Sequence, residues 1–84
     1  MKNEDIVKVI QKRVTNESLV QISFKTRTAI KGIFIESADY HQLSRKNLWR
    51  IVTERHLESF AKTHDENLAK IFNGNEFTRL ELLS

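Results

Sequence analysis

The chain has 84 residues, with 14 lysines and arginines against 11 aspartates and glutamates, and a formal net charge of +3. A chain of this length forms one domain with a thin core, because a small domain buries only about 60–65% of its unfolded surface. The absence of cysteine excludes disulfides and thiolate metal sites. No apolar run resembles a signal peptide or approaches the ~20 residues of a membrane span. We expect a single domain over residues 1–84, located in the cytoplasm.

The N-terminal part predicts a short amphipathic helix. Over residues 4–14, one helical face carries Ile6, Val9, Ile10 and Val14. Asn3 is the expected N-cap, and the acidic residues that follow it suit the positive end of the helix dipole.

Two strands are expected next. Val20, Ile22 and Phe24 alternate with polar residues, which is typical of a strand with one solvated face. A turn at residues 26–28 leads into a second strand at 29–37, which is apolar on both faces around Gly32. A glycine inside a strand marks a kink or a barrel corner. The second strand is therefore expected to bend and to serve two layers.

The middle of the chain predicts a third strand near 40–44 and a fourth at 48–53, joined by a polar turn at 45–47. Trp49, the only tryptophan, is expected in the core. The strands would form an antiparallel meander.

In the last third of the chain, the spacing of the apolar residues changes from a strand period to a helical period. Apolar residues from Leu57 to Phe72 follow helical spacing, and Asn73-Gly74 suits a helix end, so the pattern predicts a helix over 57–72. The alternative ends this helix near Thr63, restarts the chain at Asp65 and uses Asn73-Gly74 as a type I′ hairpin turn. Residues 77–82 predict a final strand.

These elements predict an α+β fold: a small, strongly bent, barrel-like antiparallel sheet with an N-terminal helix and a helix before the last strand. An N-terminal helix followed by a meander whose second strand bends at a glycine resembles the Sm-like fold of Sm proteins and of the bacterial Sm-like RNA chaperone. The run Ile35-Glu36-Ser37-x-Asp39-x-His41 is similar to the motif Ile-Glu-Ser-Phe-Asp-x-Phe of that chaperone and to the Asp-x-His of Sm proteins. Arg55-His56 lies where the chaperone has a Lys-His pair. Leu43 stands where Sm proteins commonly carry Asn.

The resemblance implies a nucleic-acid site. Tyr40 would stack on a base, a contact that contributes about 1–3 kcal/mol per base. Arg55 and His56 would contact phosphate or a base edge, and a guanidinium fork is suited to phosphate oxygens. The complete predicted site consists of Asp39, Tyr40, His41, Lys46, Arg50, Arg55 and His56. It falls in the basic part of the chain, since residues 25–55 hold seven basic and three acidic residues.

The sequence therefore predicts a non-enzymatic module of Sm-like type that binds RNA or single-stranded nucleic acid. We expect no cofactor and no metal, since His56 and His64 lie eight residues apart and no third ligand is fixed. The resemblance also implies a homo-oligomer, because Sm-like proteins join neighbouring edge strands into rings. The alternative is a protein-interaction or assembly module without a nucleic-acid ligand, which docks a partner through its sheet edges and the helix at 57–72.

Overall fold

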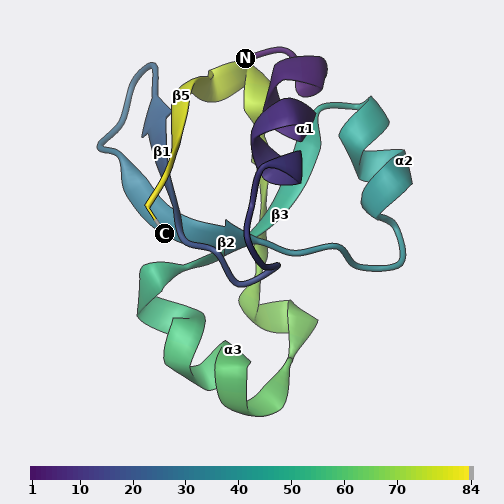
Figure 1. Ribbon diagram of the computed structural model, residues 1–84, viewed down its shortest axis with the longest axis vertical. Coiled ribbons are helices and arrows are strands. Elements are labelled where there is room, and N and C mark those ends of the chain that lie inside the picture. Colours follow the sequence, from purple (N-terminus) through teal and green to yellow (C-terminus); the bar gives the residue numbers. More distant parts are fainter. Residues whose placement is uncertain (84) are drawn as a thin grey trace.

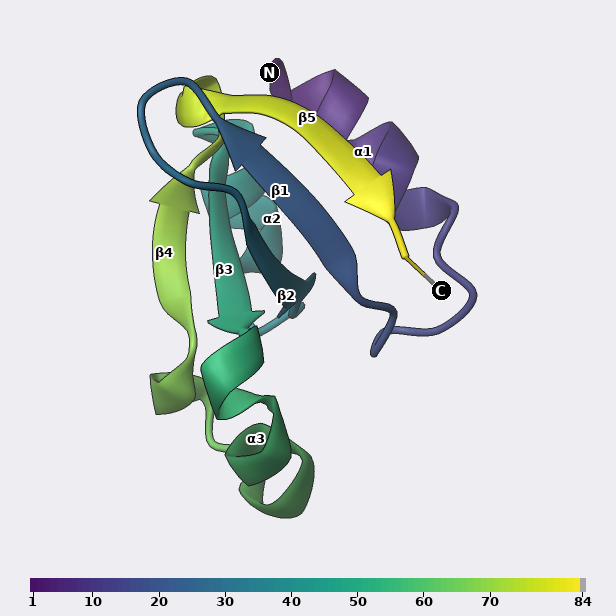
Figure 2. The same cartoon turned by 90° about the vertical axis from the view of Figure 1, so that its left-hand side faces the viewer.

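The computed structural model describes residues 1–83 as an open, five-stranded antiparallel sheet with three α-helices, which confirms the α+β class. The strands lie in the order β4-β3-β2-β1-β5, and Figure 2 shows them side by side in this order. The elements follow the chain as α1 (Asn3–Gln11), β1 (Val20–Phe24), β2 (Ile30–Phe34), α2 (Tyr40–Arg45), β3 (Leu48–Thr53), α3 (Leu57–Thr63), β4 (Lys70–Asn73) and β5 (Phe77–Leu82). Short 3₁₀ turns at Glu54–His56, Glu66–Leu68 and Gly74–Glu76 connect the last elements. Within residues 1–83, β4 and β5 each pair with one strand only, so the sheet does not close into a barrel.

The helix α1 is shorter than its apolar pattern predicts. Ile6 and Ile10 are buried as expected, but the helix ends at Gln11, so Val14 never joins the buried face and is 82% exposed. The N-cap is Lys2 rather than Asn3. The side chain of Asn3 instead donates to the backbone oxygen of Ser44, next to the C-terminal end of α2.

Gly32 is the point at which β2 changes partner. It pairs with Val20 on β1 and with Thr53 on β3, so the first half of β2 belongs to one ladder and the second half to the other. A Cβ at this position would lie 2.6 Å from the carbonyl oxygen of Val52. The close backbone approach of β3 therefore explains why a glycine stands here, and β2 changes partner at the residue where the sequence predicts a bend.

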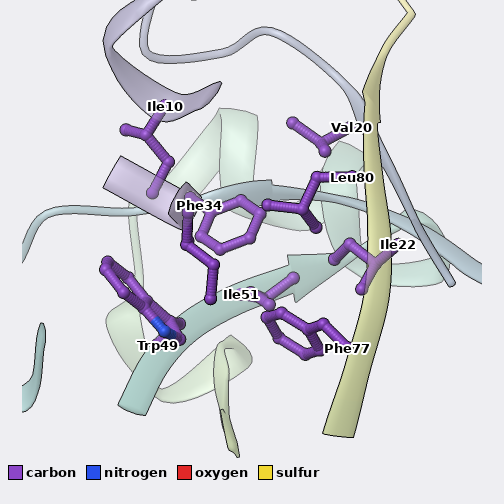
Figure 3. Packing of buried hydrophobic residues seen from close by; sticks show 9 residues of the cluster. Ile10, Val20, Ile22, Phe34, Trp49, Ile51, Phe77 and Leu80 are labelled. Atoms are coloured by element: carbon purple, nitrogen blue, oxygen red, sulfur yellow. The ribbon is translucent and has the colours of Figure 1, made fainter. Parts of the chain in front are cut away.

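The core lies between α1 and one face of the sheet, as Figure 3 shows. Trp49 is 1% exposed, which confirms its predicted burial, and its indole N–H donates to the side-chain oxygen of Asn47 at 2.8 Å. Phe34 packs against the Trp49 ring. The buried cluster comprises Ile6, Ile10, Val20, Ile22, Phe34, Trp49, Ile51, Phe77 and Leu80.

The opposite face of the sheet is also apolar at its centre. Ile33 and Val52 are paired across β2 and β3 and are buried, but they lie outside the main cluster. This agrees with the prediction that β2 serves two layers, although β2 ends at Phe34 rather than at residue 37.

The predicted strand at 40–44 is wrong, because these residues form α2. The hydroxyl of Ser37 donates to Asp39 at 2.8 Å, and the Leu43 N–H donates to the Asp39 carbonyl, so a turn starts the helix. Tyr40 then packs its ring against Trp49. The polar turn at 45–47 consequently joins α2 to β3, and it holds Asn47 at a φ of 60°.

The predicted helix over 57–72 is confirmed for residues 57–63 and is wrong beyond them. The helix α3 ends at Thr63, and Asp65 restarts the chain by accepting from the Asn67 N–H. Both features match the alternative interpretation. Ile71 and Phe72 then form part of β4, which pairs with the outer edge of β3 and satisfies its backbone hydrogen bonds. Figure 1 shows α3 projecting below the sheet, at the end opposite the N-terminus.

The predicted hairpin turn at Asn73-Gly74 is not formed, because β4 and β5 lie at opposite margins of the sheet. Gly74 instead passes close to the side chain of Asn47, and its N–H donates to the Asn47 carbonyl at 2.8 Å. The final strand β5 pairs with β1 and covers residues 77–82 as predicted.

Candidate nucleic-acid interface

Asp39 and Arg50 form an ion pair that joins the start of α2 to β3. The guanidinium donates to both carboxylate oxygens, at 2.8 and 3.2 Å. These bonds, with that from Ser37, lower the pKa of Asp39 from its ordinary value of 3.8 to about 2. The two predicted site residues therefore neutralise each other, and their ion pair holds the start of α2 against β3.

Tyr40 and His41 begin α2 and stack edge-on, with ring centroids 5.4 Å apart. Tyr40 is half-buried, and this burial raises the pKa of its hydroxyl. Both side chains line a hollow of about 450 Å³ against α1, together with Arg13 and Glu36. Because Arg13 is paired with Glu36 at 3.0 Å, this hollow offers a nucleic acid little unpaired positive charge.

The remaining predicted site residues lie at the two ends of β3. Lys46 precedes the strand and is exposed, whereas Arg55 and His56 follow it. A strand of this length spans roughly 20 Å. The structure therefore does not unite the turn at 39–41 with the Arg55-His56 corner, and of the predicted residues only Arg55 lines a groove rich in free cations.

That groove, called here the basic groove, lies where the β1–β2 loop, the start of β2, the end of β3 and β4 meet. It has a volume of about 480 Å³. Its lining consists of Arg27, Ala29, Ile30, Lys31, Thr53, Glu54, Arg55, Lys70 and Phe72.

Positive charge dominates the basic groove. It carries four cations against the single carboxylate of Glu54. Across residues 1–83, none of these cations forms an ion pair, whereas Arg13 is paired with Glu36 and Arg50 is paired with Asp39. Unpaired, exposed cations lose little when they exchange water for phosphate oxygens, so the groove is an electrostatic site for a polyanion.

An aromatic surface accompanies this charge. The guanidinium of Arg27 lies 5.0 Å from the ring centroid of Phe24 and 6.0 Å from that of Phe72. The two rings lie 6.0 Å apart, and Phe72 is half-buried at the groove wall. Flat rings beside cations are the combination that holds single-stranded nucleic acid, since bases stack on rings while the cations hold the backbone.

Sequence reasoning found only part of this groove. The basic segment 25–55 contains Arg27, Lys31 and Arg55, but it gave no reason to group these three. Lys70 and Phe72 were assigned to a helix. The signal for a strand was Asn73-Gly74 behind them, which the alternative interpretation uses as a hairpin turn, and a strand over residues 70–73 presents both side chains on one face.

Within residues 1–83, no group of three or more histidine, aspartate or glutamate side chains is placed to bind a metal ion. Over the same residues, the structure has no helix of the length and hydropathy needed to cross a bilayer. Comparisons of the chain with protein-family models, with curated proteins and with solved structures gave no match.

Proposed function

We propose that this chain is a non-enzymatic module of Sm-like type that binds RNA or single-stranded nucleic acid in the basic groove. The observation that carries the proposal is the groove itself, in which four unpaired cations surround the half-buried ring of Phe72. The N-terminal helix and the change of partner strand along β2 at Gly32 support the Sm-like interpretation.

In this proposal the two kinds of side chain have separate tasks. Lys31, Arg55 and Lys70 neutralise successive phosphates, which supplies affinity without sequence preference. A base stacks on Phe72 next to the guanidinium of Arg27, which itself has a flat face. A duplex keeps its bases stacked inside, so the aromatic surface favours single strands.

The first test is a fluorescence-anisotropy titration of labelled oligouridine at two salt concentrations. Arg55→Ala should weaken binding and reduce the slope of log affinity against log salt by about one phosphate's worth. The matched control is Arg79→Ala, which removes the same charge from an exposed position on β5 outside the groove. Equal losses from both variants would indicate nonspecific attraction to a basic surface, and no binding by the wild-type protein at low salt would reject the proposal.

The second test separates the two aromatic candidates. Phe72→Leu retains apolar packing but removes the ring, and it should weaken binding with little change in the salt slope. Tyr40→Ala should leave affinity unchanged, because Tyr40 lies in the other hollow. If Tyr40→Ala weakens binding and Phe72→Leu does not, the site lies at α2, as the sequence resemblance predicts.

We further propose that copies of this chain assemble through their sheet edges. The outer edges of β4 and β5 have no strand partner within residues 1–83. Ile71 on β4 is 48% exposed, and an exposed apolar edge strand invites pairing. Light scattering at high micromolar protein should report a homo-oligomer, and a monomer would reject this assembly.

A further inference from the structure

A second hollow lies between the α1–β1 loop and α3, on the sheet face opposite the main core. It has a volume of about 300 Å³ and is called here the acidic hollow. Its lining consists of Asn16, Glu17, Ile33, Ile35, Glu36, Phe60, His64 and Glu66.

The apolar part of the acidic hollow belongs to the second layer of the sheet. Ile33 is 5% exposed, while Ile35 and Phe60 are half-buried. No residue of α3 is fully buried, and Phe60 lines the hollow beside Ile33 and Ile35. Ile35 and Phe60 therefore leave part of their apolar surface open at the margin of the second layer.

The rim of the acidic hollow is negative. Glu17 and Glu66 are exposed and form no ion pair within residues 1–83, and Glu36 is fixed by Arg13 at 3.0 Å. The two unpaired carboxylates of Glu17 and Glu66, which lie beside an apolar floor, repel nucleic acid and anionic lipid headgroups and attract cationic side chains.

We propose that the acidic hollow docks a basic peptide segment of a partner protein, with one aliphatic side chain of the peptide seated on Ile33, Ile35 and Phe60. The charge of the rim selects the partner, since lysines or arginines that flank an aliphatic anchor would meet Glu17 and Glu66. The volume suits a single anchor side chain rather than a folded domain. This inference does not rest on the nucleic-acid proposal, because the two sites share no lining residue.

The test is an NMR titration of the isotope-labelled protein with three capped synthetic peptides. KRLIRK carries both the charge and the anchor, KRSSRK carries only the charge, and EELIEE carries only the anchor. KRLIRK should shift the backbone signals of residues 33–36 and 60–66 and bind at least about fivefold more tightly than either control peptide.

Protein variants complete the test. Glu66→Lys should weaken KRLIRK binding by about fivefold or more, through loss and reversal of one rim charge. Its matched control is Glu58→Lys, which makes the same charge change on α3 at a residue that pairs with Lys62 outside the hollow. Phe60→Ser should remove the preference for KRLIRK over KRSSRK.

Three results would overturn the inference. These are the absence of shifts at millimolar KRLIRK, equal effects of Glu66→Lys and Glu58→Lys, and shifts confined to other parts of the molecule. Glu66→Lys alters an exposed side chain and should leave the fold intact. Its effect on peptide binding therefore tests the inference even if Phe60→Ser destabilises the protein.

Discussion

Replacing Gly32 by valine tests why β2 can pair with two neighbours at one residue. A Cβ would lie 2.6 Å from the Val52 carbonyl oxygen, 2.8 Å from the Ile51 Cγ2 atom and 3.3 Å from the Thr53 Cα atom. An ordinary contact between carbon and oxygen is about 3.3–3.6 Å, so β2 and β3 must separate by several tenths of an ångström. Two of the three atoms are backbone and cannot rotate away. Overpacking of a tight site costs about 1–3 kcal/mol, and we expect at least about 2 kcal/mol for Gly32→Val.

The assay is urea unfolding followed by circular dichroism, with the free energy of unfolding extrapolated to water. Lys31→Val is the matched control, because it introduces the same side chain at the neighbouring, exposed position of β2. Strand propensity favours valine, so the control should change stability by no more than about 0.5 kcal/mol. A neutral or stabilising Gly32→Val would refute the close-approach argument.

Three further variants test other parts of the fold. The pKa of Asp39 is about 2 in the folded state against an ordinary 3.8, so the carboxylate stabilises the fold above pH 3.8 and loses this effect as pH falls toward 2. The difference in melting temperature between the wild-type protein and Asp39→Asn should therefore disappear as pH falls from 3.8 to about 2. A difference that does not depend on pH would contradict the ion pair. Asn47→Ala leaves the buried indole N–H of Trp49 without its acceptor and places alanine at a positive φ. Urea unfolding should therefore report a free energy of unfolding lower by about 2–4 kcal/mol. A decrease below about 1 kcal/mol would contradict the role of this hydrogen bond. Phe60→Ala should lower the free energy of unfolding by about 1–2 kcal/mol in the same assay, and Phe34→Ala should lower it by about 3–5 kcal/mol, because of the two only Phe34 is fully buried. Equal decreases would indicate that α3 belongs to the core.

The parts of the fold that were predictable are those in which one local signal decides the structure. Alternation over residues 20–24 indicated β1, and the glycine inside an apolar run located the residue at which β2 changes partner. In each case the burial period and the backbone requirement agree, so tertiary contacts only reinforce what the local sequence favours.

The errors arise where tertiary contacts decide. Residues 70–73 fit a helical period, yet they form β4 because β3 offers an unpaired edge that a continued helix could not satisfy. Residues 40–44 became a helix because the turn at Asp39 and the contact of Tyr40 with Trp49 both depend on β3. Neither dependence is visible within a window of neighbouring residues.

The candidate site was harder to predict than the fold, because its members come from four separate segments. The family resemblance directed attention to Asp39, Tyr40 and His41, and the structure uses Asp39 to neutralise Arg50. Arg55 lies in the basic groove, but its neighbours there come from the β1–β2 loop, from β2 and from β4. Such a grouping follows from the sheet order β4-β3-β2, which depends on β4 being a strand at all.

The placement of the basic groove beside β4 links the two proposals on nucleic-acid binding and assembly. Lys70 and Phe72 line the groove, whereas Ile71 between them points to the other face of the strand. A lysine at position 71 should therefore block edge pairing while the groove of each copy stays intact. If copies assemble through β4, a long RNA spans several grooves, and Ile71→Lys should lower affinity for it by at least about tenfold.

The same variant should bind a short oligouridine, which reaches one groove only, as tightly as the wild-type protein does. Val14→Lys is the matched control, because it adds the same charge at an exposed apolar residue that belongs neither to β4 nor to the basic groove. Anisotropy titrations with long and short RNA, run beside light scattering, check both arms. A monomeric Ile71→Lys protein that retains full affinity for long RNA would show that each groove acts alone, because avidity requires grooves held together on one particle.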